Sequence, residues 1–464
     1  MSVLKKIDPI SIPAVENSLA LFDIMPTTVA FNRTHTRELL PIMNITRNGP
    51  FTFRLFSDNQ FIDFSKTWLF LKTSIQKKGA NDVWENPDPA SVNDQHVGVI
   101  QNYASSFIKQ LKITINSTNV FDSDVLYPWR AYISTEFGTD ASFRHGMLEA
   151  GGYFSDTPGK EMTGEENEGL MKRAQQFWGG KQVSNMTQLN FDLAHQSNLF
   201  INNTDIIFEI WPQSDSFLFQ FISYKPKPTK EGQNPGPQIP EGTFRIVIHD
   251  IRLFVTLVDV NQSLQNQIAK TMESTPAKYS MRKMLLRHVY LPKGLTNITW
   301  NVFQSIVPRR LLVFFIDNEA FHGDSSKPPF KFEDAGVQSI CVEANNQIVP
   351  DYPYRFDFSS KTNTDWVRAF IDFYSSQDIV NGERDIELDL YKYTHGWTIF
   401  SFTLASSYRD IGDSFELIKN GTTVIKTLFN KPIEDPGYML VALGEFDEVL
   451  SINADRILSV DGSI

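Results

Sequence analysis

The sequence contains one cysteine and no long apolar run. Because Cys341 has no second cysteine to pair with, an intramolecular disulfide is excluded, and its apolar neighbours predict a buried thiol in a reducing compartment. The longest strongly apolar run, residues 311–316, is far shorter than the roughly 20 residues that a membrane-spanning helix needs. The first residues carry two lysines but no apolar stretch typical of a signal peptide. We therefore expect neither secretion nor a membrane span.

The sequence also lacks the short motifs of common catalytic and metal sites. It contains no G-x-S-x-G, P-loop, H-E-x-x-H or zinc-ligand spacing. His145 and Glu149 would share one face of a helix, but two ligands do not complete a metal site, and a surface pair explains them. Asp385, Glu387 and Asp389 alternate in a way that fits the polar face of a strand better than a calcium site. The sequence thus predicts no catalytic residues, no cofactor-binding residues, no cofactor and no metal ligands.

Positive charge is scarce relative to negative charge. The chain has 43 Lys and Arg against 54 Asp and Glu, a net charge of −11, which disfavours wrapping of nucleic acid by the whole surface. Any contact with a genome would therefore be local. The basic groups are Lys225, Lys227 and Lys230 between prolines, and Arg282, Lys283, Arg287 and His288. A solvated face is the default interpretation of both, with genome contact as the alternative for the second group.

Aromatic residues are abundant, with 37 Phe, 14 Tyr and 8 Trp, and they favour half-buried β-strands. Alternation of apolar and polar residues predicts strands at 51–55, 111–116, 206–210, 251–257, 386–390 and 415–419. The apolar run 311–316 predicts a strand buried on both faces. Asn420-Gly421 predicts a type I′ hairpin with 422–429 as the returning strand. Helical signals are few, at 128–133, 141–150 and 365–374.

The length of 464 residues fits two sandwiches of about 200 residues each. The polar stretch 261–278 follows a strong strand and predicts the linker between them. The expected organisation is an N-terminal arm (1–40), a first sandwich (41–260) with long loops at 151–187 and 224–242, the linker (261–278) and a second sandwich (279–464).

A local repeat supports two similar halves. Tyr127-Pro128-Trp129-Arg130 has a counterpart in Tyr352-Pro353-Tyr354-Arg355, and each follows an alternating strand and precedes a short helical segment. Upstream, strand 68–72 corresponds to strand 311–315. Duplication of one sandwich is the simplest account, and a single large barrel with two similar corners is the alternative.

Several motifs, in this order, resemble the double jelly-roll major capsid proteins of Polinton (Maverick) elements, adintoviruses and virophages over nearly the whole chain. In the first half they are Tyr127-Pro128-Trp129-Arg130-Ala131-Tyr132, Asp215-Ser216-Phe217-Leu218 and Ile248-His249-Asp250-Ile251-Arg252-Leu253. In the second half they are Val307-Pro308-Arg309-Arg310, Ala320-Phe321-His322-Gly323, Pro329-Phe330-Lys331-Phe332 and Glu445-Phe446-Asp447-Glu448. The chain differs from the family in having Pro328 before Pro329 where Asn-Pro is usual.

The resemblance implies an all-β fold of two tandem eight-stranded antiparallel jelly-roll sandwiches with short helical inserts in loops. It implies a structural protein and not an enzyme: three copies form a pseudo-hexagonal capsomer, and capsomers build an icosahedral shell around a DNA genome. Loops 151–187 and 224–242 would belong to the outer crown. The implied partners are further copies of the chain, a penton or minor capsid protein and, by local contact, the enclosed DNA. The implied location is a virion assembled in the host cytoplasm or nucleus.

Other functions remain open at this point. One is a minor capsid or penton protein, although that role normally needs one jelly roll. Others are a carbohydrate-active enzyme or a carbohydrate-binding or adhesion module built on a β-sandwich. Such an enzyme typically needs two carboxylates about 5 to 10 Å apart in a cleft, a feature that only the tertiary structure can show.

Overall fold

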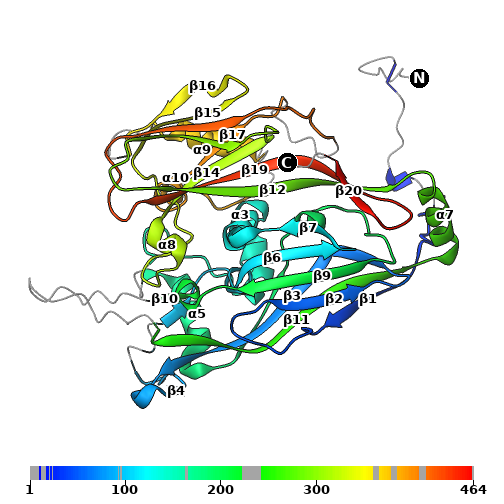
Figure 1. Cartoon of the computed structure of the whole chain (residues 1–464), viewed down its shortest axis with the longest axis horizontal. Helices are drawn as coiled ribbons and strands as arrows, with labels where there is room; N and C mark the ends of the chain where they lie inside the picture. Colours follow the sequence, from blue (N-terminus) through cyan, green and yellow to red (C-terminus); the bar gives the residue numbers. More distant parts are fainter. Residues whose placement is uncertain are drawn as a thin grey trace, which may run out of the picture.

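The computed structural model describes residues 10–11, 17–19, 21–22, 24–91, 94, 97–161, 166–221, 242–358, 365–377, 384–406 and 414–461. Within these residues the chain forms two β-sandwiches, which lie one above the other in Figure 1. All strand pairs within the sheets are antiparallel.

The first sandwich consists of two main sheets. One has β1 (Phe31–Leu39), β11 (Phe244–Val260) and β3 (Phe61–Lys78) side by side, with β4 (Trp84–Glu85) and β8 (Val183–Gln188) both paired to β3. The other has the order β2 (Phe51–Phe56), β9 (Asp205–Pro212), β6 (Ile108–Ile115) and β7 (Thr118–Asp122). A short pair, β5 (Val97–Val99) and β10 (Phe219–Phe221), lies in the connections.

The second sandwich also has two sheets. One has the order β12 (Ala277–Leu291), β19 (Tyr438–Ile452), β14 (Arg310–Asp317) and β17 (Ile399–Thr403), with β20 (Leu458–Asp461) paired to β19. The other has the order β13 (Asn297–Phe303), β18 (Thr423–Phe429), β15 (Val337–Ala344) and β16 (Gln347–Arg355).

The two sandwiches have the same topology. If the eight main strands of each are numbered along the chain, one sheet has the order 1-8-3-6 and the other 2-7-4-5 in both halves. This is the strand order of a jelly roll, so the predicted fold class is confirmed. The shared order also favours duplication over a single large barrel.

Helices occupy the connections. They are α2 (Tyr103–Ser106), α3 (Tyr127–Gly138), α4 (Ala141–Arg144), α5 (Glu168–Phe177), α6 (Asp215–Leu218), α7 (Gln262–Met272), α8 (Asn318–His322), α9 (Val367–Ser376) and α10 (Leu390–Thr394). The structure also contains short 3-10 turns: η1 (Asn17–Leu19), η2 (Ala80–Asp82), η3 (Asp124–Leu126), η4 (Met147–Gly151), η6 (Trp178–Gly180) and η7 (Asp192–His195). The predicted helices at 128–133 and 365–374 are confirmed, whereas only 141–144 of the third is α-helical.

Strand predictions based on alternation hold where one face of the strand meets a core. In β2, Phe51, Phe53 and Leu55 are buried and Arg54 is exposed, as the alternation predicts. The predicted strands at 111–116, 206–210 and 251–257 lie in β6, β9 and β11, with a boundary difference of one residue at 116.

Two strand predictions are wrong. Residues 386–390 alternate as predicted, with Ile386 and Leu388 buried, but Glu387 has a φ of 51°, so the backbone is not extended. Residues 415–419 form no strand, and β18 pairs instead with β13 and β15. Asn420 does not have the positive φ that a type I′ turn requires, and it bridges Ile306. The predicted hairpin is therefore absent.

Several segments expected to be an arm, a linker or a loop contain regular structure. The N-terminal arm (1–40) contains β1, which pairs with β11, and the linker (261–278) contains α7 and the start of β12. The predicted loop 151–187 contains α5 and most of β8. These elements were missed because their sequences are polar: β1 is exposed at most positions, and α7 exposes most of its surface. Loop 224–242, except for Gly242, and Lys225, Lys227 and Lys230 lie outside the described residues.

The repeated tetrapeptide does not mark equivalent positions. Tyr127-Pro128-Trp129-Arg130 begins helix α3, whereas Tyr352-Pro353-Tyr354-Arg355 belongs to strand β16. Strands 68–72 and 311–315 do lie in the third strand of their sandwiches. The duplication therefore rests on topology and not on the tetrapeptide.

Among the described residues, no helix is long and apolar enough to cross a membrane.

Each sandwich depends on its own apolar interior. Phe208 on β9 is 0% exposed, so Phe208→Ala should lower the free energy of unfolding by about 3 to 5 kcal/mol through lost burial and a new cavity. Arg54→Ala should change the free energy of unfolding by less than about 1 kcal/mol. It breaks an ion pair with Asp205, but the side chain of Arg54 is 60% exposed. Urea denaturation followed by fluorescence measures both, and similar losses for the two variants would contradict this account.

Candidate functional site: the interface between the two sandwiches

The sheet β12–β19–β14–β17 carries apolar side chains on both faces. In β14, Val313 and Phe315 join the core of the second sandwich, whereas Leu312 and Phe314 join the cluster that fills the first. Residues 311–316 are all buried, which confirms the predicted burial on both faces. The outer face of this sheet is therefore covered by the first sandwich.

Helix α3 lies between the two sandwiches (Figure 1). It belongs to the connection between the fifth strand, β7, and the sixth, β8, and Pro128 stands in its first turn, where no backbone N–H is needed. Most of its side chains are buried all round, as expected for a helix that meets packed surfaces on all sides.

Aromatic rings join α3 to the second sandwich. Trp129 stacks on Phe321, with centroids 4.5 Å apart and planes at 12°, and Tyr132 stacks on Phe330 at 4.3 Å and 9°. Phe217 meets Trp129 edge-on at 5.4 Å. Each such pair contributes about 0.5 to 1.5 kcal/mol beyond its buried area. The contacts unite four separate motifs of the sequence at one place.

A glycine permits the closest approach at this interface. Gly323, which follows α8, has a φ of 98°, and a Cβ there would lie 2.9 Å from the backbone nitrogen of Phe217. Neither the conformation nor the space allows a side chain. The two halves therefore touch backbone to backbone at this position.

Polar contacts fix the position of β12 against the first sandwich. Arg130, which is 2% exposed, donates to the carbonyl of Met284 at 2.7 Å and to Asp192 Oδ1 at 2.6 Å. The same carboxylate accepts the backbone N–H of Met284 at 3.2 Å. Because burying one of these groups without a partner costs about 1 to 3 kcal/mol, the network favours one registration of the two sandwiches.

A charged network lies at the C-terminal end of α3. Glu136 is 0% exposed and receives hydrogen bonds from Lys392 and Tyr153. Arg144, also buried, donates to the carbonyl of Glu136 and lies 3.4 Å from Glu387. Lys392 and Glu387 come from the second half of the chain, so the network joins the two sandwiches.

The network sets the ionisation of its members. Burial opposes the charged form of Glu136, but Lys392 and Arg144 attract the carboxylate, and its pKa lies below the ordinary 4.5. Burial and the neighbouring Glu136 raise the pKa of Tyr153 well above 10, so the phenol stays a donor. Glu136 is therefore a buried carboxylate held ionised by cations from both halves.

At the opposite end of the interface, the turn just before β20 contacts the first sandwich. Arg456 donates to the backbone and side-chain oxygens of Asn202, both at 2.9 Å. Tyr279 of β12 accepts the backbone N–H of Ile201 at 3.0 Å. Contacts at the middle of β12, near its start and at the turn before β20 together resist sliding and rotation of one sandwich on the other.

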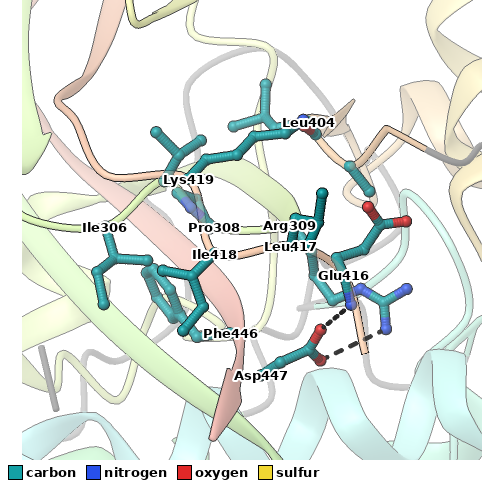
Figure 2. Close-up of a pocket in the computed structure, with 12 residues that line it drawn as sticks. Ile306, Pro308, Arg309, Leu404, Glu416, Leu417, Ile418, Lys419, Phe446 and Asp447 are labelled. Atoms are coloured by element: carbon teal, nitrogen blue, oxygen red, sulfur yellow. Dashed lines mark hydrogen bonds and ion pairs between the residues drawn. The ribbon is translucent and has the colours of Figure 1, made fainter. Parts of the chain in front are cut away.

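Figure 2 shows a shallow pocket where two more motifs of the sequence meet. Asp447 accepts the backbone N–H of Glu416 at 2.9 Å and lies 3.8 Å from Arg309. Burial raises the pKa of Asp447, and the positive charge of Arg309 opposes this rise. The lining is mostly aliphatic, with Phe446 as its one aromatic residue among those described, and its two carboxylates, Glu416 and Asp447, both make structural contacts. This arrangement differs from the aromatic-lined cleft expected of a carbohydrate-active enzyme.

The histidine and carboxylates weighed as metal ligands in the sequence lie singly or in pairs. His145 Nε2 is 3.0 Å from Glu387 and not bonded to Glu149. Asp385 and Asp389 accept backbone N–H groups of Glu387 and Lys392. Within the described residues, no three His, Cys, Asp or Glu side chains gather closely enough to hold a metal ion. Cys341 is only half-buried, which corrects the expectation of a buried thiol.

The second basic group is partly neutralised. Arg282 lies 3.8 Å from Glu445 and Lys283 lies 3.0 Å from Glu448, whereas Arg287 and His288 are exposed. The prediction of a solvated face is therefore wrong for Arg282 and Lys283.

Sequence reasoning missed Glu136, Arg144 and Lys392. Glu136 had one signal, a carboxylate next to Phe137 in a helix that also carries Tyr127, Trp129 and Tyr132. Its partner Lys392 lies in the other half of the chain, and no sequence pattern links them.

The Glu136 network makes stability dependent on pH. Because the pKa of Glu136 is lower in the folded state than in the unfolded state, its contribution is complete above about 4.5 and is lost as the pH falls through the folded value. Glu136→Gln should lower the free energy of unfolding by about 3 kcal/mol at neutral pH, because it leaves Lys392 buried without a counter-charge. The loss should be smaller in acid.

Denaturation curves at about pH 7 and about pH 3 test this expectation. The control is Glu343→Gln, which breaks a more exposed pair with Lys426 and should have an effect below about 1 kcal/mol. Equal losses for Glu136→Gln at both pH values would contradict the linkage.

Gly323 offers a second test of the interface. Gly323→Ala should be more destabilising than Gly336→Ala by about 2 kcal/mol, because Gly336 also has a positive φ (65°) but has no atom within 4 Å of its Cβ position. Thermal denaturation measures both variants. Equal losses of stability in the two variants would mean that Phe217 moves away from the new Cβ at no energetic cost.

Comparisons with known proteins place this fold. No model of a protein family matches the sequence. The chain is similar to an uncharacterized protein of Caenorhabditis elegans, with 24% identity over 422 residues that cover 90% of this chain and 94% of that protein.

Solved structures show much greater similarity in fold than in sequence. A chain of the Sputnik virophage matches with a TM-score of 0.65 and 11% identity over 99% of this chain and 94% of its own length. The mavirus major capsid protein matches at 0.53 and 10% (99% and 96% covered), and the Faustovirus major capsid protein at 0.53 and 8% (96% and 93%). The chain therefore has the double jelly-roll fold of the major capsid proteins of virophages and large DNA viruses.

Proposed function

We propose that the chain is a major capsid protein. The observation that carries this proposal is the pair of jelly rolls: two sandwiches of identical strand order, joined by a buried interface into one building block. Solved structures with this fold include the mavirus and Faustovirus major capsid proteins, each matched over more than nine tenths of both chains.

The mechanism of such a protein is assembly without a chemical step. Three copies would present six similar sandwiches and form a pseudo-hexagonal trimer, and trimers would close an icosahedral shell. Contacts between capsomers can each be weak, because a closed shell makes many of them at once. The net charge of −11 keeps free subunits soluble before assembly.

The remaining parts of the proposal follow from this role. The chain would be located in a virion that encloses DNA and assembles in the host cytoplasm or nucleus, within a Polinton-type or virophage-like element. A penton or minor capsid protein would occupy the five-fold positions. Arg287 is an exposed cationic candidate for local contact with DNA, whereas burial lowers the pKa of the neighbouring His288 and favours its neutral form. Within 151–187, the segments between α5 and its neighbours would contribute to the outer crown.

The oligomeric state tests the proposal. Purified protein should elute as a trimer of the 53.0 kDa chain in size-exclusion chromatography with light scattering, and electron microscopy should show capsomers or closed particles. A protein that stays monomeric at high concentration and forms no particles would contradict a capsid role.

A further inference from the structure

The segment before β1 exposes most of its apolar side chains. Phe22 alone is 95% exposed. Pro26 disfavours a helical backbone at the residue before it, and residues 24–29 form no helix or strand. So many exposed apolar side chains in one short segment indicate a surface that binds another one. We name this set the apolar arm: Leu19, Leu21, Phe22, Ile24, Met25 and Val29.

The apolar arm leaves the body at the end where the chain passes from one sandwich to the other. β1 begins at Phe31, which pairs with Val260, the last residue of β11. Helix α7 follows, and β12 then begins with Ala277, which pairs with Ile452 at the end of β19. In Figure 1, α7 and β20 lie at this end of the molecule, and α8 lies towards the other. We name it the linker end.

The pocket of Figure 2 lies in the part of the second sandwich that is nearer to the linker end. Its lining comes from residues 306–309, between β13 and β14, and from 404–405 and 416–419, between β17 and β18. Strand β14 begins opposite Glu445 and ends opposite Tyr438. The connection before β14 is therefore on the same side as Ile452, the linker end.

The rim of the pocket is apolar and exposed. Leu417 is 85% exposed, and the neighbouring Ile418 is exposed as well. Figure 2 shows Ile418 next to Ile306 and Phe446, which line the same pocket. The pocket thus offers apolar side chains both at its rim and at its base.

Hydrogen bonds hold the pocket in shape within the single chain. Asp447 accepts the backbone N–H of Glu416 at 2.9 Å. Lys419 donates from its ammonium group to the carbonyl of Leu404 at 2.8 Å, and its own carbonyl accepts the backbone N–H of Val307 at 2.8 Å. A preformed pocket binds an extended segment at a lower cost in conformational entropy.

We propose that the apolar arm of one copy binds in this pocket of a second copy of the chain. In the single chain both Phe22 and Leu417 are exposed, so the arm does not cover the pocket of its own chain. The proposal rests on the proposed function, because copies that stand side by side in one orientation have their linker ends at the same level. The contact joins two different surfaces, and such contacts close a ring of three copies.

The arm is long enough for this contact. Residues 19–30 span up to about 40 Å when extended. The stretch of β19 from Phe446 to Ile452 is about 20 Å long. The arm can therefore pass from the linker end to the depth of the pocket.

A second group of exposed apolar residues does not compete for the arm. Leu40, Ile42 and Met43 follow β1, and β1 runs away from the linker end. The pocket rim lies at the end where the arm emerges, so it is the better placed acceptor.

A peptide tests the pocket as the binding site. The protein is the full chain with Leu21, Phe22, Ile24 and Met25 all changed to Ser, so that its own arms do not compete. A fluorescent peptide of residues 17–31 should bind this chain saturably in fluorescence anisotropy. Adding Leu417→Asp should raise the dissociation constant at least about tenfold, because it places a charge where the apolar anchors bind.

The matched control is Ile457→Asp, an equally exposed apolar position near the linker end that does not line the pocket. It should bind the peptide as well as the chain without it, and a peptide with the same four residues changed to Ser should not bind. Circular dichroism verifies that each chain is folded. Equal losses of binding from Leu417→Asp and Ile457→Asp would overturn the pocket as the site.

Cross-linking tests whether the arm reaches a second copy. In a Cys341→Ser background, a chain with Phe22→Cys is co-expressed with a chain that has Leu417→Cys and a different mass tag. A short bis-maleimide should link the two tags. If the tags are not linked, and a chain with both cysteines is linked only within itself, the contact between copies is overturned.

The outcomes separate this contact from the capsid role. A trimeric chain that binds no peptide would overturn the arm contact and leave the capsid role intact. A monomeric chain that binds the peptide in the pocket would overturn the capsid role and the contact between copies. Binding that depends on Leu417, together with links between the two tags, supports the proposal.

Discussion

The two-sided burial of the sheet β12–β19–β14–β17 is the constraint on which the rest of the structure depends. Its strands send alternate side chains into two different cores, so a slip of one residue in register would exchange Leu312 and Phe314 with Val313 and Phe315. In an isolated second sandwich, the outward apolar side chains of this sheet would face water, which is unfavourable. The second sandwich therefore needs the first as a cover for this face.

Helix α3 satisfies this requirement, and its buried polar groups make the fit specific. Apolar contacts alone tolerate small shifts, whereas Arg130 and Glu136 lose their partners when β12 or Lys392 moves. The same groups would be costly in a wrong arrangement, since an unpaired buried charge destabilises by about 3 to 5 kcal/mol. The interface thus combines the energy of aromatic packing with the selectivity of hydrogen bonds.

The firmly joined pair of sandwiches is the property that links this structure to the proposed assembly. Subunits of a closed shell must hold a fixed angle between their contact surfaces, because small deviations accumulate around a ring. The chain fixes one such angle internally, with polar anchors at the middle of β12, near its start and at the turn before β20.

The sequence by itself determined the β class, most of the strands that line a single core and the burial of 311–316 on both faces, because alternation and apolar runs are local signals. It mispredicted the polar segments that form β1, α5 and α7, whose apolar content is low or confined to one stripe. Only the tertiary structure decided which elements meet: Glu136 with Lys392, Trp129 with Phe321, and α3 with a sheet from the other half of the chain. These contacts join residues far apart in the chain, and their energy arises from the packing that brings them together, so no local pattern encodes them.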